Sequence, residues 1–135
     1  MIADSDVLID ALRGRSPARE RIEIELGTGH LATTVVNVFE LRSGARTPRE
    51  RAKVEALLAA LQVLPLDEAA ANDAAAIRLH LEAAGTPIGM ADYLIAGICR
   101  SRRSTLLTFN REHFSRVPDL ALTQMVRARP KGPGG

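Results

Sequence analysis

The chain has few of the residues that typify disulfide-bonded or aromatic-rich proteins. Of its 135 residues, one is cysteine, none is tryptophan and 3% are aromatic. A single cysteine cannot form an internal disulfide, which indicates a reducing compartment. Cys99 stands in an apolar helical pattern, where a free cysteine usually packs as a small hydrophobic residue. Without tryptophan, the composition offers no sign of a platform for stacking bases or sugars.

Long apolar runs are absent as well. No stretch approaches the roughly 18 apolar residues that cross a bilayer, and no charged-then-apolar leader opens the chain. We therefore expect a soluble protein located in the cytoplasm. The length suits one domain, and a domain of this size buries about two thirds of the surface that its unfolded chain exposes, so folding requires neither a disulfide nor a metal.

Lysine is scarce. Of the 18 basic residues, only Lys53 and Lys131 are lysines, which leaves 16 arginines and a net charge of +2. Guanidinium groups bind phosphate in a bidentate way, so the excess of arginine favours a nucleic-acid partner. Biased codon usage explains the same excess equally well, and composition leaves both explanations open.

Short apolar segments alternate with helical patterns along the chain. Strands are predicted at about 1–4, 30–33, 63–66, 105–108 and 120–125, with helices at about 6–13, 17–26, 35–43, 48–61, 68–84 and 89–102. Pro65 lacks an amide donor, which places the third strand at a margin of the sheet. The alternation predicts an α/β sandwich with a largely parallel sheet in one domain at 1–126, followed by a disordered tail at 127–135.

Three acids stand among apolar neighbours. Asp4 ends the first predicted strand, Glu40 lies between Phe39 and Leu41, and Asp92 lies in the apolar helix 89–102. In open α/β sheets the ligand crevice lies at the carboxyl ends of the strands, where Asp4 stands. An ionised carboxylate is costly to bury unless it is paired or binds a cation, and oxygen ligands suit Mg²⁺ or Mn²⁺.

Simpler roles for these acids remain open at this point. Asp is among the best residues for capping a helix, so Asp4 could serve the helix that follows it. Each acid could instead pair with an arginine, and the arginines considered for this are Arg13, Arg42 and Arg100. The histidines His30, His80 and His113 lie far apart and lack the spacing of zinc motifs, so we expect them to be surface or packing residues.

The order of these segments resembles that of the PIN-domain ribonucleases, and specifically of the VapC toxins of toxin–antitoxin pairs. The resemblance covers about Met1 to Met125 and rests on four segments: Asp4-Ser5-Asp6 after an apolar strand, TTVVNVFELRSGA, GMADYLIAGIC and LLTFNREHF. DYLIA and T-x-N-x-x-x-F are its more specific parts. It implies a three-layer α/β/α sandwich with a short, mostly parallel central sheet, in which the acids meet in one pocket.

The resemblance also implies the roles of individual residues. Asp4, Glu40 and Asp92 match the family's acidic positions and would hold Mg²⁺ or Mn²⁺. Asn110 stands where the family often has a fourth acid; its amide can ligate or orient water but adds no charge, which puts a second metal in doubt unless Glu112 contributes. Hydroxyl groups would then hydrogen-bond the carboxylates, and the candidates are Ser5, Thr33, Thr34 and Thr108. Helix capping is the simpler role for Thr34 and Thr108.

The implied function is metal-assisted hydrolysis of RNA by a toxin. Such a protein has a small VapB-like antitoxin as its partner and forms a homodimer, and with the antitoxin a heterotetramer or a larger assembly. The leucines at 57, 58 and 61 form a stripe that could face a partner, although a core-facing helix is the simpler interpretation.

Two other functions compete with this one. Asp4-Ser5-Asp6 also resembles the nucleophile pair of haloacid-dehalogenase-like phosphatases, in which Asp4 would attack phosphorus and Asp6 would act as the acid. A degenerate PIN scaffold that binds RNA or protein without cutting is the other alternative, and Asn110 is the feature that favours it. In the ribonuclease interpretation, Asp6 becomes a local cap or a group that supports Asp4.

Overall fold

The computed structural model describes residues 1–127, which form five strands and seven helices. The strands are β1 (Ile2–Ala3), β2 (Ala32–Thr34), β3 (Gln62–Leu64), β4 (Leu106–Thr108) and β5 (Leu122–Gln124). The helices are α1 (Ser5–Leu12), α2 (Ala18–Gly27), α3 (Val35–Gly44), α4 (Pro48–Ala59), α5 (Glu68–Ala83), α6 (Met90–Ser101) and α7 (Arg111–Phe114). The tail predicted to be disordered lies, from residue 128 onward, outside the described residues.

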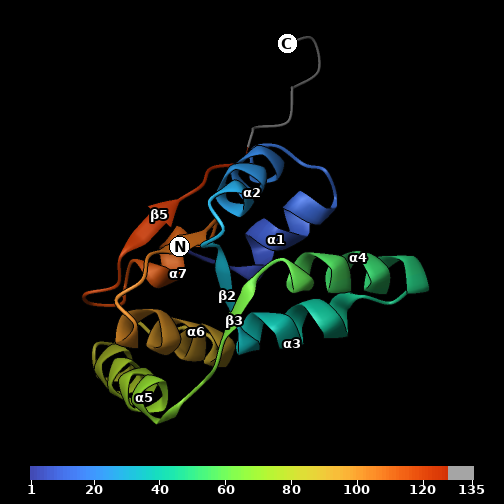
Figure 1. Cartoon of the computed structure of the whole chain (residues 1–135). Helices are drawn as coiled ribbons and strands as arrows, with labels where there is room; N and C mark the ends of the chain where they lie inside the picture. The colour runs from blue at the N-terminus through green and yellow to red at the C-terminus, as the bar shows by residue number, and fades with distance from the viewer. Residues whose placement is uncertain (128–135) are drawn as a thin grey trace.

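The strands form one parallel sheet with the order β3-β2-β1-β4-β5. The central strand β1 pairs with β2 through Ile2 and Ala32, and with β4 through Ile2 and Leu106. As the sequence predicts, β3 and the last strand occupy the two edges (Figure 1). The carboxyl ends of β1 and β4 therefore lie side by side, and the residues that follow them meet at one edge of the sheet.

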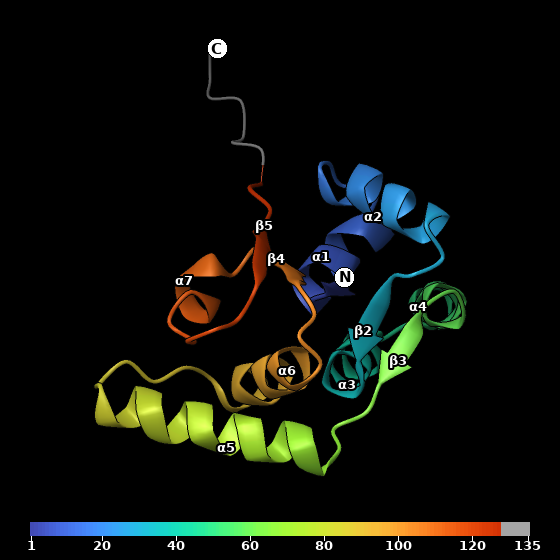
Figure 2. The ribbon, with the colours of Figure 1, turned by 60° about the vertical axis from the view of Figure 1, so that its left-hand side comes forward.

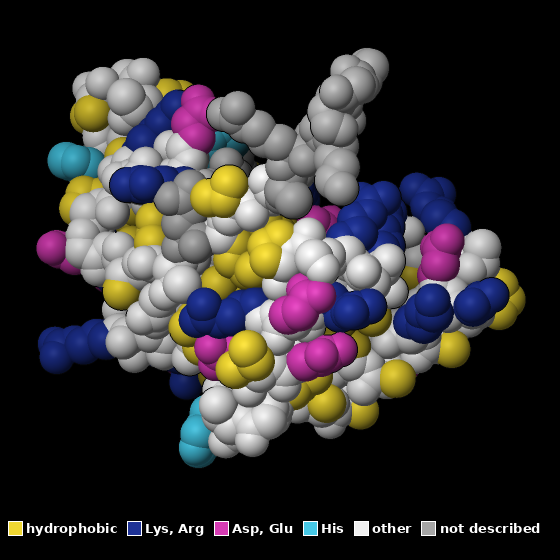
Figure 3. All heavy atoms as spheres, turned by 90° about the horizontal axis from the view of Figure 1, so that it is seen from above, with side chains coloured by type: hydrophobic (Ala, Val, Ile, Leu, Met, Phe, Trp, Pro, Cys, Tyr) yellow, Lys and Arg dark blue, Asp and Glu magenta, His cyan; other side chains and the backbone are white. Residues whose placement is uncertain are grey.

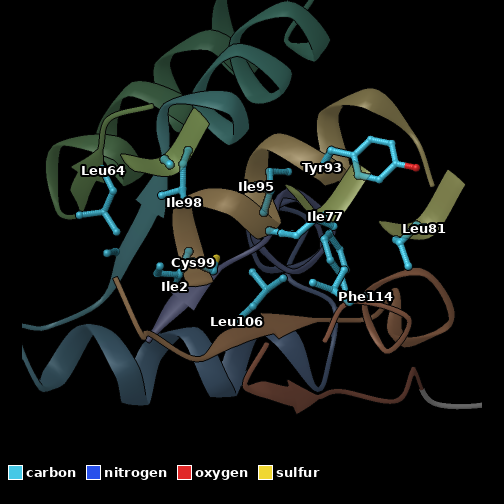
Figure 4. Close-up of a cluster of buried hydrophobic side chains, with 14 residues drawn as sticks. Ile2, Leu64, Ile77, Leu81, Tyr93, Ile95, Ile98, Cys99, Leu106 and Phe114 are labelled. Carbon is cyan, nitrogen blue, oxygen red and sulfur yellow. The ribbon is translucent and has the colours of Figure 1, made fainter. Parts of the chain in front are cut away.

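Helices cover both faces of the sheet, which confirms the three-layer sandwich. Helices α5 and α6 lie on one face, while α1 to α4 lie on the other (Figure 2). Two separate clusters of buried side chains fill the two interfaces, and successive strand residues alternate between them: Ile2 and Leu106 belong to one cluster, Ala3 and Leu107 to the other. The first cluster includes Phe114, which anchors α7 (Figure 4).

Local signals predicted most of the helix starts. Thr47 accepts a hydrogen bond from the Glu50 amide at 3.1 Å, and Asp67 accepts one from the Ala70 amide at 2.9 Å. The leucine stripe of α4 packs into the core, since Leu58 is buried there, which confirms the simpler interpretation. The segment NREHF, for which no helix is predicted above, contains the short helix α7, whose last residue, Phe114, is fully buried.

Helix α6, which carries Asp92, packs very closely against α5. A Cβ atom added at Gly97 would lie 2.5 Å from the carbonyl oxygen of Ala70 and 2.7 Å from the Cβ atom of Ala74. Only glycine fits at such a separation, because real Cβ atoms do not approach backbone oxygens so closely. Gly97 therefore sets how near α6 lies to α5, and so helps to place Asp92.

Cys99 also lies in this helix and is fully buried, as predicted. Burial raises the pKa of its thiol to about 12, so the side chain packs as a neutral apolar group. Among residues 1–127, none of the helices combines the length and the apolar character that crossing a membrane requires.

Candidate active site

Asp4 stands at the carboxyl end of the central strand and is almost fully buried, at 6% exposure. Its Oδ1 atom accepts hydrogen bonds from the Ser5 amide at 2.8 Å and from the Asn37 side-chain amide at 3.0 Å. Its Oδ2 atom accepts a hydrogen bond from the Thr108 hydroxyl at 2.8 Å, across from the end of β4. Asp4 is also the N-cap of α1, so the capping role and the site role coexist in one side chain.

The surroundings of Asp4 oppose its negative charge. Burial, followed by the negative charge of Asp6, raises the pKa of the Asp4 carboxyl from 3.8 to about 7. The hydrogen bonds from Thr108 and the Ser5 amide act in the opposite direction, and the charge of Asp92 raises the pKa further. These main causes include no neighbouring cation, so ionised Asp4 still needs a positive partner.

Asn37 links Asp4 to Glu40. Its amide nitrogen lies 3.0 Å from Asp4 Oδ1, 2.8 Å from Ser5 Oγ and 3.5 Å from Glu40 Oε1, and its side chain is fully buried. The Ser5 hydroxyl in turn donates to Glu40 Oε1 at 2.8 Å. The buried amide therefore holds two acids from different elements in one hydrogen-bonded network.

The start of α3 fixes the position of Asn37. Thr34 caps this helix, since its hydroxyl accepts a hydrogen bond from the Asn37 amide at 3.2 Å and donates to Asn37 Oδ1 at 2.7 Å. This confirms the capping role expected for Thr34. Residues three apart share a helix face, so Asn37 and Glu40 both point toward α1. The sequence analysis did not identify Asn37. The signal that could have identified it is its position three residues before Glu40 on the same helix.

Asp92, in the first turn of α6, forms a second group with residues that follow β4. Its Oδ2 atom lies 3.2 Å from His113 Nδ1, and the Asn110 side-chain nitrogen lies 3.0 Å from the same Nδ1 atom. His113 is 40% exposed, in line with the predicted surface position, and it also lies within hydrogen-bond distance of Asp92. The short helix α7 turns its side chain back toward α6, which the linear spacing of the histidines does not reveal.

Asp6 lies beside Asp4 and is held by backbone amides on both sides. Its carboxylate accepts hydrogen bonds from the amides of Val7 at 2.7 Å and Phe109 at 3.2 Å. Burial raises the pKa of Asp6 as well, and hydrogen bonds from those amides oppose the effect. The residue therefore ties the start of α1 to the segment after β4.

Other candidates lie elsewhere. The Thr33 hydroxyl donates to the Ala3 carbonyl at 2.8 Å, so it supports the sheet and not a carboxylate. Glu112 is 82% exposed and pairs with Arg116 at 3.6 Å, and no hydrogen bond joins it to the three acids within residues 1–127. Arg42 pairs with Glu55 at 2.8 Å and Arg100 with Asp73 at 3.3 Å, so neither arginine neutralises a site acid.

Comparison with known proteins decides the family. The family model of the PIN domain matches residues 1–120. The chain belongs to the PIN domain family. Ribonuclease VapC10 of Mycobacterium tuberculosis is 39% identical over 114 residues, which cover 84% of this chain and 85% of that relative. The tRNA(fMet)-specific endonuclease VapC of Shigella flexneri is 33% identical over 121 residues, covering 87% and 91%. The predicted membership among the VapC ribonucleases is confirmed.

Solved structures of VapBC complexes share the fold. The chain matches a DNA-bound VapBC structure from Salmonella typhimurium with a TM-score of 0.82 and 30% identity, covering 91% of this chain and 96% of that one. VapBC2 from Rickettsia felis, bound to a promoter DNA fragment, matches with a TM-score of 0.84 over 92% and 97%, and at 22% identity it shows the fold alone. The phosphatase interpretation is wrong, because the chain belongs to the PIN domain family.

Within the PIN fold, the structure arranges the predicted acids as two linked groups. Asp4 and Glu40 share the Asn37 and Ser5 network, while Asp92 lies with Asn110 and His113, close enough for its charge to act on Asp4. Among residues 1–127, no three histidine, cysteine or acidic side chains converge closely enough to ligate one metal ion directly.

A groove opens beside Glu40. It has a volume of about 310 Å³ and lies between α1, α3 and α4. Its lining is mostly apolar, with Arg13 and Lys53 among the charged residues. Seen from above, Lys and Arg side chains gather on the side of the molecule where α4 lies, with acidic side chains among them (Figure 3).

Proposed function

We propose that this protein is the ribonuclease toxin of a toxin–antitoxin pair and that it hydrolyses RNA phosphodiester bonds with the help of Mg²⁺ or Mn²⁺. The observation that carries the proposal is the buried Asp4 carboxylate, which lies near Asp6 and Asp92 with no cation among the main influences on its pKa. The names of the relatives, a ribonuclease and a tRNA-specific endonuclease, support RNA as the substrate class.

The donor set fits a hard divalent cation. Asp4 and Asp92 would bind it, and Glu40 would bind directly or through water, with Asn110 at the fourth position. Mg²⁺ usually keeps several waters and uses one or two carboxylates, so it does not need three converging protein ligands. When bound, such an ion activates a water and neutralises charge that develops on the phosphate.

The chain's own residues would hold the acids in place for this chemistry. Thr108, Ser5 and Asn37 donate hydrogen bonds to the Asp4 carboxylate or to its partner Glu40 and so orient their oxygen atoms. Because these hydrogen bonds hold the carboxylates in place beforehand, the side chains do not need to reorganise when the substrate phosphate binds. Asn110 is neutral, so the fourth position of the site carries no negative charge. This favours one bound ion over two.

Cleavage of RNA by paired variants tests the proposal. Asp92→Asn should lower RNA cleavage by at least about 100-fold, because it removes a charged ligand from the ion. Asp119→Asn is the matched control, since Asp119 is exposed and has φ 60°, a conformation that asparagine tolerates. Undiminished cleavage by Asp92→Asn would contradict the assignment of Asp92 to the catalytic site. A wild-type protein that binds RNA without any Mn²⁺-dependent cleavage would instead support the degenerate scaffold.

The proposed partner is a VapB-like antitoxin that docks in the groove beside Glu40. The apolar lining suits a helix or an extended segment of another chain, and a segment seated there would lie beside Glu40. Solved VapBC complexes with the same fold support a partner of this kind. Ala45→Arg, which would fill the groove, should weaken antitoxin binding at least about 10-fold while RNA cleavage by the free toxin persists. Unchanged binding in a titration would place the antitoxin elsewhere.

The proposed assembly is a homodimer that forms a heterotetramer or a larger complex with the antitoxin. The proposed location is the cytoplasm, where RNA is available and a buried free thiol such as Cys99 persists. Light scattering of the toxin with and without its antitoxin, together with cell fractionation, tests both statements.

A further inference from the structure

The His113 side chain lies within hydrogen-bond distance of the Asp92 carboxylate. His113 Nδ1 lies 3.2 Å from Asp92 Oδ2, and the two side chains are 40% and 22% exposed. No other hydrogen bond to the Asp92 carboxylate occurs within residues 1–127. Asp4, in contrast, accepts hydrogen bonds from three donors. The orientation of the Asp92 side chain therefore depends on one imidazole.

The chemistry of the contact decides where the imidazole proton lies. An ionised carboxylate only accepts hydrogen bonds, whereas an imidazole nitrogen donates or accepts according to its tautomer. With the proton on Nδ1, His113 donates to Asp92 Oδ2. With the proton on Nε2, the acceptors His113 Nδ1 and Asp92 Oδ2 would face each other at 3.2 Å. The only hydrogen bond to Nδ1 would then come from the neutral Asn110 amide. The charged partner makes the stronger bond, which favours the proton on Nδ1.

We propose that His113 is a positioning residue for the metal ligand Asp92: its Nδ1–H group holds Oδ2 and leaves Oδ1 directed to the cation. This inference rests on the proposed function, because it assigns a task to a residue of the same site. A group that orients a metal ligand typically changes metal affinity by about 10- to 100-fold when it is removed. His113 is expected to act in this way through Asp92, without touching the substrate.

Variants at position 113 separate the Nδ1 contact from other roles. Asn carries its amide nitrogen on Cγ, as His carries Nδ1, so His113→Asn keeps a donor at the same place along the side chain. His113→Ala removes the donor, and His113→Gln moves it one bond farther from the backbone. His80→Ala is the matched control, because His80 is exposed on α5 and outside the site.

Titration of the full chain with Mn²⁺ by calorimetry, in the absence of RNA, measures the effect without relying on catalysis. His113→Ala should bind Mn²⁺ about 10- to 100-fold more weakly than wild type, and His113→Gln should be weakened similarly. His113→Asn should stay within about 3-fold of wild type, and His80→Ala should be unchanged. Circular dichroism confirms that each variant is folded.

The tautomer supplies a second readout that requires only the wild-type protein. Nitrogen-15 NMR of His113 should show the proton on Nδ1 in the metal-free protein. A proton on Nε2, or Mn²⁺ binding by His113→Ala equal to that of wild type, would overturn the inference while the proposed function stands. Failure of the wild-type protein itself to bind Mn²⁺ would overturn the metal role in the proposed function, and this inference with it.

Discussion

Single side chains at the site balance burial against charge. Asp4 receives hydrogen bonds from Ser5, Asn37 and Thr108, which would normally stabilise a carboxylate. Burial and the charge of Asp6 outweigh them, so the pKa rises to about 7. Below about pH 7 the folded, metal-free protein therefore favours a protonated Asp4 carboxyl.

The raised pKa predicts how the stability of the metal-free protein depends on pH. Between pH 4 and pH 7 the folded state binds a proton at Asp4 that the unfolded state has lost, so the free energy of unfolding falls as the pH rises through this window. The contribution is at most about 4 kcal/mol, at about 1.4 kcal/mol for each pH unit. Urea denaturation in EDTA between pH 4.5 and pH 7.5 measures it.

Asp4→Asn is the comparison for this measurement. The variant cannot titrate at position 4, so its stability should fall less steeply over the same pH range, the remaining slope coming from groups such as Asp6. Identical slopes for the two proteins would show that Asp4 is already ionised in the folded state.

Asn37 offers a second prediction at this scale. Asn37→Ala removes the amide that donates to Asp4 and Ser5 and leaves Thr34 without its partner, so the free energy of unfolding should fall by about 1–3 kcal/mol. RNA cleavage should fall as well, because only Ser5 would then join Glu40 to Asp4. Asn72→Ala on the exposed side of α5 is the control. Equal stability of the two variants in urea would contradict the structural role of Asn37.

Among the elements, the contact between α5 and α6 sets the position of the site. Glycine at position 97 lets α6 approach the backbone of α5 at Ala70 and Ala74, and Asp92 lies on the same helix little more than one turn away. The pairing of β1 with β4 places Asp4 beside Thr108, because it brings the carboxyl ends of the two strands together.

Gly97→Ala tests the helix contact. Alanine has the higher helix propensity by about 1 kcal/mol, yet its methyl group would lie 2.5 Å from the Ala70 carbonyl oxygen, so we expect a net loss of about 2 kcal/mol or more. Gly44→Ala in α3 meets no atom within 4 Å and should be neutral or slightly stabilising. Denaturant unfolding compares the two, and a Gly97→Ala protein as stable as wild type would show that the helices separate at little cost.

At the scale of the whole molecule, the site exists only in the folded chain. Its acids come from the end of β1, the middle of α3 and the first turn of α6, and Thr108 and His113 come from the last third of the chain. An unfolded chain does not hold these groups together, so a cation that binds here binds the folded state alone and stabilises it.

Thermal unfolding tests this linkage. At a concentration of Mn²⁺ 100 times its dissociation constant, the folded state should gain about 2.7 kcal/mol, which raises the midpoint of a domain of this size by several degrees. EDTA should reverse the shift, and Asp92→Asn should show little of it while Asp119→Asn keeps it. A shift of the same size in Asp92→Asn would place the cation at another site.

The sequence by itself determined the succession of strands and helices along the chain and the α/β sandwich. It also determined the edge position of β3 and the buried state of Cys99. It also singled out Asp4, Glu40 and Asp92, because a carboxylate amid apolar neighbours stands out in any sequence. These are local properties of periodicity, capping and burial. The contact of His113 with Asp92 spans 21 residues and that of Asn37 with Asp4 spans 33, and only tertiary packing brings them together. The same packing directs Glu112, Arg42 and Arg100 away from the site acids.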